Sequence, residues 1–111
     1  MFATQNSLHN LTAIIDYNKW QATGRTNEVL GKASLPEKWN SFGWDVQEVD
    51  GHDHHQLFDV LTKTDNTCPK MIIAHTLKGK GVSFMEDDNN WHYRVPVVQD
   101  VHAAQVELGI A

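Results

Sequence analysis

The chain has 111 residues, of which 41% are hydrophobic and 21% are charged, so it can form one domain or part of one but not two. Fourteen acidic residues against nine Lys and Arg give a net charge of -5, which argues against nucleic-acid and anionic-membrane partners. The longest apolar runs are far below the roughly 20 residues that cross a bilayer, the first residues show no secretory signal, and Cys68 is the single cysteine. We therefore expect a soluble protein of the cytoplasm.

The first elements in chain order are a helix end, a strand and a loop. Residues 1–8 have the pattern of a helix end, with Asn10 suited to a left-handed stop. Residues 11–15 form a nearly continuous apolar run, which is typical of a strand buried on both faces in a parallel sheet. Residues 21–32 have little periodicity and predict a loop of a length that is often functional. Because nothing precedes the helix end, we expect the chain to begin inside an element.

The rest of the chain predicts helices and strands in alternation. Ser34 and Glu37 fit a capping box at the start of a helix that Gly43 ends. Strand, helix and strand in alternation, with short connections, predict an α/β fold with a parallel sheet and helices on both faces. Three strands would leave one sheet edge uncovered, so we expect a missing neighbour. The later elements are a strand over 44–49, a helix capped by Asp53 and Gln56 that buries Leu57, Phe58, Val60 and Leu61, a buried strand over 71–77, and a final helix with Val101, Ala104 and Leu108 on one face.

Polar residues follow the first and last strands, at the ends where open parallel sheets bind ligands. Asn18 has an amide oxygen and Trp20 a main-chain carbonyl, and oxygen donors suit Mg²⁺; a tight turn that favours Asn is the alternative. The run Lys78-Gly79-Lys80-Gly81 allows close backbone approach to an anion and supplies positive charge, and His92 adds a donor. These groups predict a phosphate site, with a solvated basic loop as the alternative.

Three histidines close in sequence, His52, His54 and His55, raise the question of a zinc site. With Asp53 as the helix cap, His54 and His55 point in different directions around the first turn, and no fourth ligand is nearby. We interpret all three as surface histidines. Cys68 has no His or cation partner in the sequence pattern and is expected to be unreactive.

Five ordered motifs cover nearly the whole chain. They are Asp16-Tyr17-Asn18-Lys19-Trp20-Gln21, Glu37-Lys38-Trp39 with Phe42-Gly43-Trp44, Val49-Asp50-Gly51-His52, Thr76-Leu77-Lys78-Gly79-Lys80-Gly81-Val82-Ser83-Phe84-Met85, and Trp91-His92. Together they resemble the thiamine-diphosphate-binding region of transketolases, specifically the N-terminal subunit of split bacterial transketolases. The resemblance implies that residues 1–111 are part of a thiamine diphosphate (pyrophosphate-binding) domain that is incomplete at its N-terminus.

Residue by residue, the resemblance implies a set of roles at the cofactor. Asn18 would give its side-chain oxygen to Mg²⁺, and Trp20 would give its main-chain carbonyl to the same ion. Lys78 matches the lysine that meets the cofactor diphosphate, and His92 matches the histidine at the junction of cofactor and sugar substrate. Asp16 is interpreted as a flanking position and is left out of the site.

The resemblance also implies that part of the enzyme's machinery lies elsewhere. The family's Gly-Asp-Gly motif, which carries another Mg²⁺ ligand, and the glutamate that protonates the aminopyrimidine ring are not in this sequence. We therefore expect the chain alone to bind cofactor poorly and to show no ketol transfer. The implied partners are a sugar phosphate and a pyrimidine-binding half or C-terminal subunit, in a dimer or heterotetramer.

The leading interpretation is a truncated piece of a transketolase-like enzyme, and a subunit completed by another polypeptide is a second form of it. One alternative is a fragment of another thiamine diphosphate enzyme, such as a deoxyxylulose-phosphate synthase or a ketoacid dehydrogenase component. The pair Trp91-His92 favours transketolase over these. A further alternative is a non-catalytic interaction fragment that associates through its unfinished sheet edge.

Overall fold

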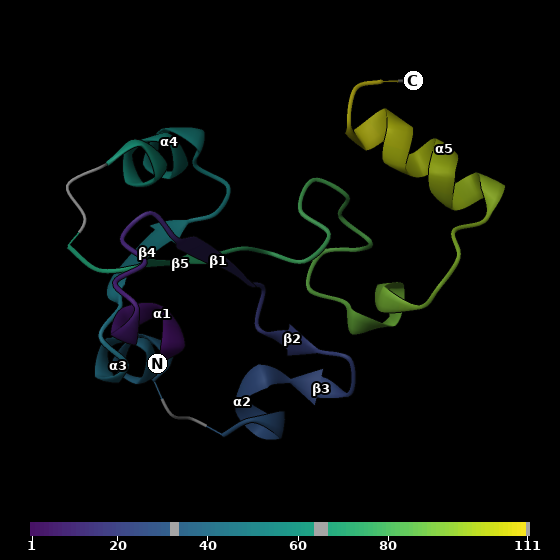
Figure 1. The fold of residues 1–111 in the computed structure, drawn as a ribbon. Coiled ribbons are helices and arrows are strands. Elements are labelled where there is room, and N and C mark those ends of the chain that lie inside the picture. Colours follow the sequence, from purple (N-terminus) through teal and green to yellow (C-terminus); the bar gives the residue numbers. More distant parts are fainter. Residues whose placement is uncertain (32–33, 64–66, 111) are drawn as a thin grey trace.

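The computed structural model describes residues 1–31, 34–63 and 67–110. Its centre is a parallel sheet of β1 (Thr12–Tyr17), β4 (Asp45–Asp50) and β5 (Lys70–His75), in the order β1-β5-β4 (Figure 1). Because β1 and β4 start opposite the same residue of β5, the carboxyl ends of all three strands lie side by side. The predicted α/β fold with a parallel sheet is confirmed.

The central strand β5 is buried along almost its whole length. Met71, Ile72 and Ile73 are at most 1% exposed, since β5 has a neighbouring strand on each side. The predicted strand over 71–77 is confirmed, although it ends at His75 and the chain leaves the sheet two residues earlier than expected.

The first strand is an edge strand of the described sheet, and the prediction that it is buried on both faces is wrong. Residues along β1 alternate between exposed and half-buried, and Ile14 is 54% exposed. Its neighbour β5 covers one edge only, and α4 (His54–Thr62) packs against β4 rather than β1.

Helices lie on both faces of the sheet, as expected. Figure 1 shows α1 (Phe2–Gln5) and α3 (Leu35–Ser41) on one face and α4 on the other. On the first face, Ala3, Trp44, Met71 and Ile73 form the buried core, and the rings of Trp39 and Trp44 meet edge to face at 5.1 Å.

The predicted helix starts at Ser34 and Asp53 are confirmed by their caps. The Ser34 hydroxyl accepts from the backbone N–H of Glu37 at 3.4 Å, and the Asp53 carboxylate accepts from two N–H groups of the first turn of α4. The expected burial within α4 holds for Val60 but not for Phe58, which is 67% exposed, or for Leu61. These two side chains lie on the exposed part of α4.

Two early predictions are wrong in detail. The left-handed residue after α1 is Ser7, with φ 52°, and not Asn10. Residues 21–32 are not one loop, because β2 (Trp20–Gln21) and β3 (Gly24–Arg25) form a short antiparallel hairpin that leads into α2 (Thr26–Val29). Pairing across this hairpin, which no hydrophobic periodicity signals, gives the segment its structure; positions 32 and 33 lie outside the described residues.

The C-terminal part extends away from the sheet (Figure 1). Turns over residues 77–87 lead to the 3₁₀ helix η1 (Asn89–His92) and then to α5 (Val98–Glu107). The predicted final helix is therefore confirmed. In the part of the chain that the structure describes, no helix has the length and apolarity needed to cross a membrane.

Candidate functional site

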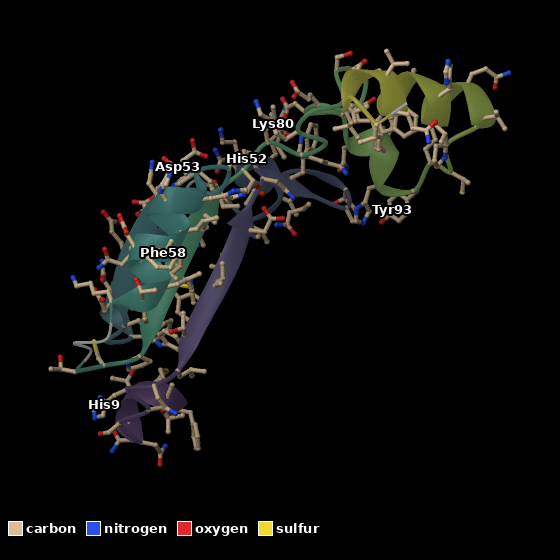
Figure 2. All side chains as sticks on the ribbon, turned by 90° about the horizontal axis from the view of Figure 1, so that it is seen from above. His9, His52, Asp53, Phe58, Lys80 and Tyr93 are labelled. Carbon is tan, nitrogen blue, oxygen red and sulfur yellow. The ribbon has the colours of Figure 1, made fainter. Side chains whose placement is uncertain are left out.

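An open cleft of about 510 Å³ lies where β1 and β5 end. Figure 2 shows two residues of its lining, His52 and Lys80, at the junction between the sheet and the segment that leads to α5. The polar side chains that line the cleft belong to Asp16, Asn18, His52, Thr76, Lys78 and Lys80. They meet there because the matched register of the parallel strands brings the segments that follow them to one edge.

Asn18 lies in the cleft and also forms the tight turn that was the alternative for this residue. Its side-chain oxygen accepts from the backbone N–H of Trp20 at 2.9 Å, and Lys19 between them has a left-handed φ of 69°. The turn and a ligand role are compatible, because an amide oxygen has two lone pairs and this hydrogen bond uses one. The turn fixes the direction of the Asn18 side chain at the mouth of the cleft.

The loop after β5 carries Lys78 and Lys80, which also line the cleft. Gly79 has a φ of 75°, and a Cβ at this position would overlap the backbone carbonyl of Met85. The loop folds back because the N–H of Asp87 donates to the carbonyl of Lys78 at 2.9 Å. The two lysines of this loop give the cleft positive charge, which suits an anion.

His52 has a role at the cleft that its interpretation as a surface histidine missed. The residue is exposed, but its Nε2 accepts from the backbone N–H of Leu77 at 2.8 Å. This bond connects the turn after β4 to the residue before Lys78. The position of His52 directly after Asp50-Gly51, at the carboxyl end of a strand, is the sequence signal that could have identified it.

The other two histidines lie apart from this contact. His54 and His55 are exposed in the first turn of α4. Among the described residues, no group of three His, Cys, Asp or Glu side chains is placed to hold a metal ion.

Asp16 is a second residue of the cleft that sequence reasoning left out of the site. Its carboxylate accepts from the hydroxyl of Thr76, and both side chains line the cleft. The carboxylate therefore adds a negative oxygen donor next to the Asn18 amide. Its place at the carboxyl end of β1, two residues before Asn18, was visible in the sequence.

The structure brings Asn18 and Lys78 together but leaves the other predicted site residues outside the cleft lining. The Trp20 indole N–H donates to Asp87 at 2.8 Å. His92 is the last residue of η1, is exposed, and packs edge to face against Tyr93 at 4.6 Å between ring centroids. The roles expected for Trp20 and His92 therefore remain predictions.

Two carboxylates tie down the loop that carries Lys78. Hydrogen bonds from Arg25 and Trp20 lower the pKa of Asp87 to about 2. The backbone N–H and the hydroxyl of Ser83 donate to Glu107, at 2.5 and 2.8 Å, and lower the pKa of that carboxyl. Both carboxylates are thus charged at neutral pH. Asp87 lies on the loop and bonds to the hairpin, whereas Glu107 lies on α5 and bonds to the loop.

Comparison with known proteins assigns the chain to a family. All of residues 1–111 match the family described as transketolase, thiamine diphosphate binding domain. The chain is 40% identical over 110 residues to an apulose-4-phosphate transketolase subunit from Phocaeicola vulgatus, which covers 97% of this chain and 39% of that protein. It is 42% identical over 88 residues to a 6-deoxy-6-sulfo-D-fructose transketolase subunit from a Clostridium species, which covers 78% of this chain and 32% of that protein.

A solved structure agrees with this match at the level of the fold. The crystal structure of transketolase from Campylobacter jejuni superposes on the chain with a TM-score of 0.89 at 23% identity, covering 97% of this chain and 17% of that chain. The chain is thus an α/β domain of the thiamine-diphosphate-binding class. It belongs to the transketolase family, as the resemblance implied. It spans about 39% of the length of the first curated relative that it matches.

Proposed function

We propose that this chain contributes the diphosphate-binding part of a transketolase-type enzyme, which moves a two-carbon ketol unit between sugar phosphates with thiamine diphosphate and Mg²⁺. The observation that carries the proposal is the shared cleft of Asn18 and Lys78, in a chain that belongs to this family. An amide oxygen suits a hard cation, and an ammonium suits the diphosphate that the cation binds.

The chemistry of the cleft fits such a group. Its oxygen donors are Asn18 and Asp16, on the side of β1, and its cations are Lys78 and Lys80, on the side of β5. Gly79 allows the loop to pack closely at the cleft, because a side chain there would overlap the backbone of Met85 and push the loop outward. Oxygen donors and cations in one cleft match a divalent cation bound next to a diphosphate.

Each predicted residue has a role in this proposal. Asn18 and the main-chain carbonyl of Trp20 bind Mg²⁺, and Lys78 neutralises the diphosphate. His92 donates to phosphate or substrate oxygens at the junction of cofactor and sugar. When bound, thiamine diphosphate supplies the carbanion stabilisation that ketol transfer requires.

The site needs groups from outside this chain. Mg²⁺ takes nearly ideal six-fold coordination, and Asn18 and Trp20 supply two oxygens. Two of the relatives are, by name, subunits of a transketolase. We therefore propose that a pyrimidine-binding half or C-terminal subunit completes the site, in a dimer or heterotetramer, and that this chain alone binds cofactor weakly and transfers no ketol unit.

Titration of the full chain with thiamine diphosphate and Mg²⁺ tests the site. Calorimetry should give an affinity weaker than micromolar, and chemical shifts of the ¹⁵N-labelled chain should change at Lys78 and Gly79. Asn18→Ala and Lys78→Ala should each remove these changes, whereas Lys38→Ala, on the exposed surface of α3, should keep them. Micromolar affinity of the chain alone would contradict the incomplete site, and unchanged binding by both cleft variants would contradict its location.

The role of His92 needs the completed enzyme. With a partner chain that restores ketol transfer, His92→Ala should reduce turnover or ketose use, and His54→Ala should be close to neutral. Equal losses from the two variants would contradict the different roles assigned to these histidines.

A further inference from the structure

Three side chains form one cluster beside the cleft. The guanidinium of Arg25 donates to both carboxylate oxygens of Asp87 at 2.6 Å, and its carbon lies 3.8 Å from the centre of the Trp20 ring. The indole N–H of Trp20 donates to the same carboxylate at 2.8 Å. We call Trp20, Arg25 and Asp87 the clamp.

The clamp connects the two segments that carry the proposed ligands. Trp20 and Arg25 face each other across the β2–β3 hairpin, which begins two residues after Asn18. Asp87 lies on the loop after β5, and its own N–H donates to the carbonyl of Lys78 at 2.9 Å. A displacement of Asp87 would therefore be transmitted to the backbone of Lys78.

A second contact joins the same two segments. The side-chain amide of Asn89 donates to the backbone carbonyls of Gln21 and Ala22, at 3.1 and 3.2 Å. The hairpin and the loop thus meet at two places, one through a charged cluster and one through backbone carbonyls. The charged cluster is the one that lies nearer to Lys78 in sequence.

The contacts within the clamp indicate that it orients the loop rather than stabilising the fold. The side chains of Arg25 and Asp87 are 37% and 45% exposed, and exposed ion pairs contribute little to stability. The two-pronged contact nevertheless fixes the relative orientation of the two groups, because its two hydrogen bonds run side by side. Asp87 also has a left-handed φ of 56°, a conformation that residues other than glycine seldom adopt without support from their contacts.

We propose that the clamp is a positioning unit that fixes Lys78 relative to Asn18, so that the two reach the same metal diphosphate. Trp20, Arg25 and Asp87 are thus positioning residues, and their side chains need not touch the cofactor. The inference rests on the proposed function for its ligand, but the position of the loop can be measured without any ligand.

The test uses the full ¹⁵N-labelled chain and four variants. Arg25→Gln and Asp87→Asn each remove the charge pair, and the double variant shows whether they act as a unit. Asp59→Asn, on the exposed surface of α4, is the control with the same change of charge as Asp87→Asn. Without ligand, the amide signals of Lys78 and Gly79 should shift in the same way in both single variants and in the double variant, and should not shift in the control.

The second measurement adds thiamine diphosphate with Mg²⁺. The affinity should fall roughly tenfold in each single variant, because small misplacements of binding groups greatly weaken binding. Where saturation is not reached, the initial slope of the binding curve is compared instead. The double variant should bind no more weakly than either single one, and the melting temperature of each should stay close to that of the control.

The outcomes separate this inference from the proposed function. Loop signals that shift in the clamp variants, in a chain that binds no cofactor, would support the positioning of the loop and contradict the proposed function of the cleft. Unchanged amide chemical shifts of Lys78 and Gly79 in the clamp variants would overturn the inference, whether or not cofactor binds. Where the chain binds cofactor, an affinity that is equal in all variants would also overturn it. If the losses of binding free energy in the two single variants add up in the double variant, Arg25 and Asp87 act separately, which would contradict a single unit.

Discussion

The ring of His52 accepts a hydrogen bond from the backbone N–H of Leu77, at 2.8 Å between Nε2 and nitrogen. The bond spans two strand ends, since His52 follows β4 and Leu77 follows β5. An imidazole nitrogen accepts only when it carries no proton, so the neutral ring has its proton on Nδ1. His52 thereby holds the backbone one residue before Lys78.

Replacement of His52 should therefore affect the cleft. We expect His52→Ala to weaken binding of thiamine diphosphate with Mg²⁺ and to speed hydrogen exchange at the Leu77 amide, because that N–H loses its acceptor. His54→Ala is the matched control and should change neither. Equal exchange rates at Leu77 in the two variants would show that the bond does not form in solution.

Gly79 should tolerate no side chain. Gly79→Ala places a Cβ against the Met85 carbonyl and also keeps a left-handed φ, whereas Gly109→Ala has a similar left-handed φ with no atom of the described residues within 4 Å of its Cβ. The control, Gly109→Ala, should lower the free energy of unfolding by about 1 kcal/mol. Gly79→Ala should lower it by more, on the order of 3 kcal/mol. Urea unfolding measures both, and equal costs would mean that the loop can open to admit the methyl group.

The clamp should respond to acid in a defined range. The pKa of Asp87 is about 2, because Arg25 and Trp20 donate to its carboxylate, whereas an ordinary aspartate has a pKa of about 3.9. Since the pKa is lower in the folded chain, the stabilisation from these contacts is complete above about pH 4 and is lost as the pH falls toward about 2.

The indole proton signals in an NMR pH titration can check this range. The Trp20 signal should change with a midpoint at about pH 2, the pKa of the Asp87 carboxylate to which its indole donates. The Trp91 indole donates to the backbone carbonyl of Phe84 at 2.9 Å, an acceptor that does not titrate, and provides the control. A Trp20 change near neutral pH, or one that coincides with the Trp91 change, would refute the assignment to Asp87.

Lys70 should be important for stability although it lies far from the cleft along β5. Its ammonium is buried and donates to the carbonyls of Val60 and Lys63, at 2.7 and 2.6 Å. Lys70→Met keeps the length of the side chain but leaves these carbonyls at the end of α4 without their donor. We expect a loss of about 1 to 3 kcal/mol in the free energy of unfolding, against at most about 0.5 kcal/mol for the exposed Lys38→Met.

The fold could be predicted from the sequence where local signals agree with the packing. The apolar run of β5 and the caps at Ser34 and Asp53 are such signals, because each depends on neighbours in the sequence. The position of β1 at the edge of the described sheet depends on which strands pair, and nothing in the run over 11–15 carries that information. For the same reason the exposure of Phe58 was not predicted.

The candidate site could be predicted only in part, for a similar reason. Asn18 and Lys78 were found because polar residues after parallel strands meet at one sheet edge. The contact of His52 with Leu77 and that of Asp87 with Arg25 join residues 25 and 62 positions apart. Such distant partners are decided by the folded backbone, which a single sequence does not reveal.

The central claim is that a metal diphosphate binds between Asn18 and Lys78. The most direct measurement uses Mn²⁺, which prefers the same oxygen ligands as Mg²⁺ and broadens the NMR signals of nearby nuclei. With thiamine diphosphate and Mn²⁺ added to the full chain, we expect the signals of Asn18, Trp20 and Lys78 to broaden first, and much less so with Mn²⁺ alone. Broadening that begins at other acidic surfaces and leaves these three residues sharp would contradict the account.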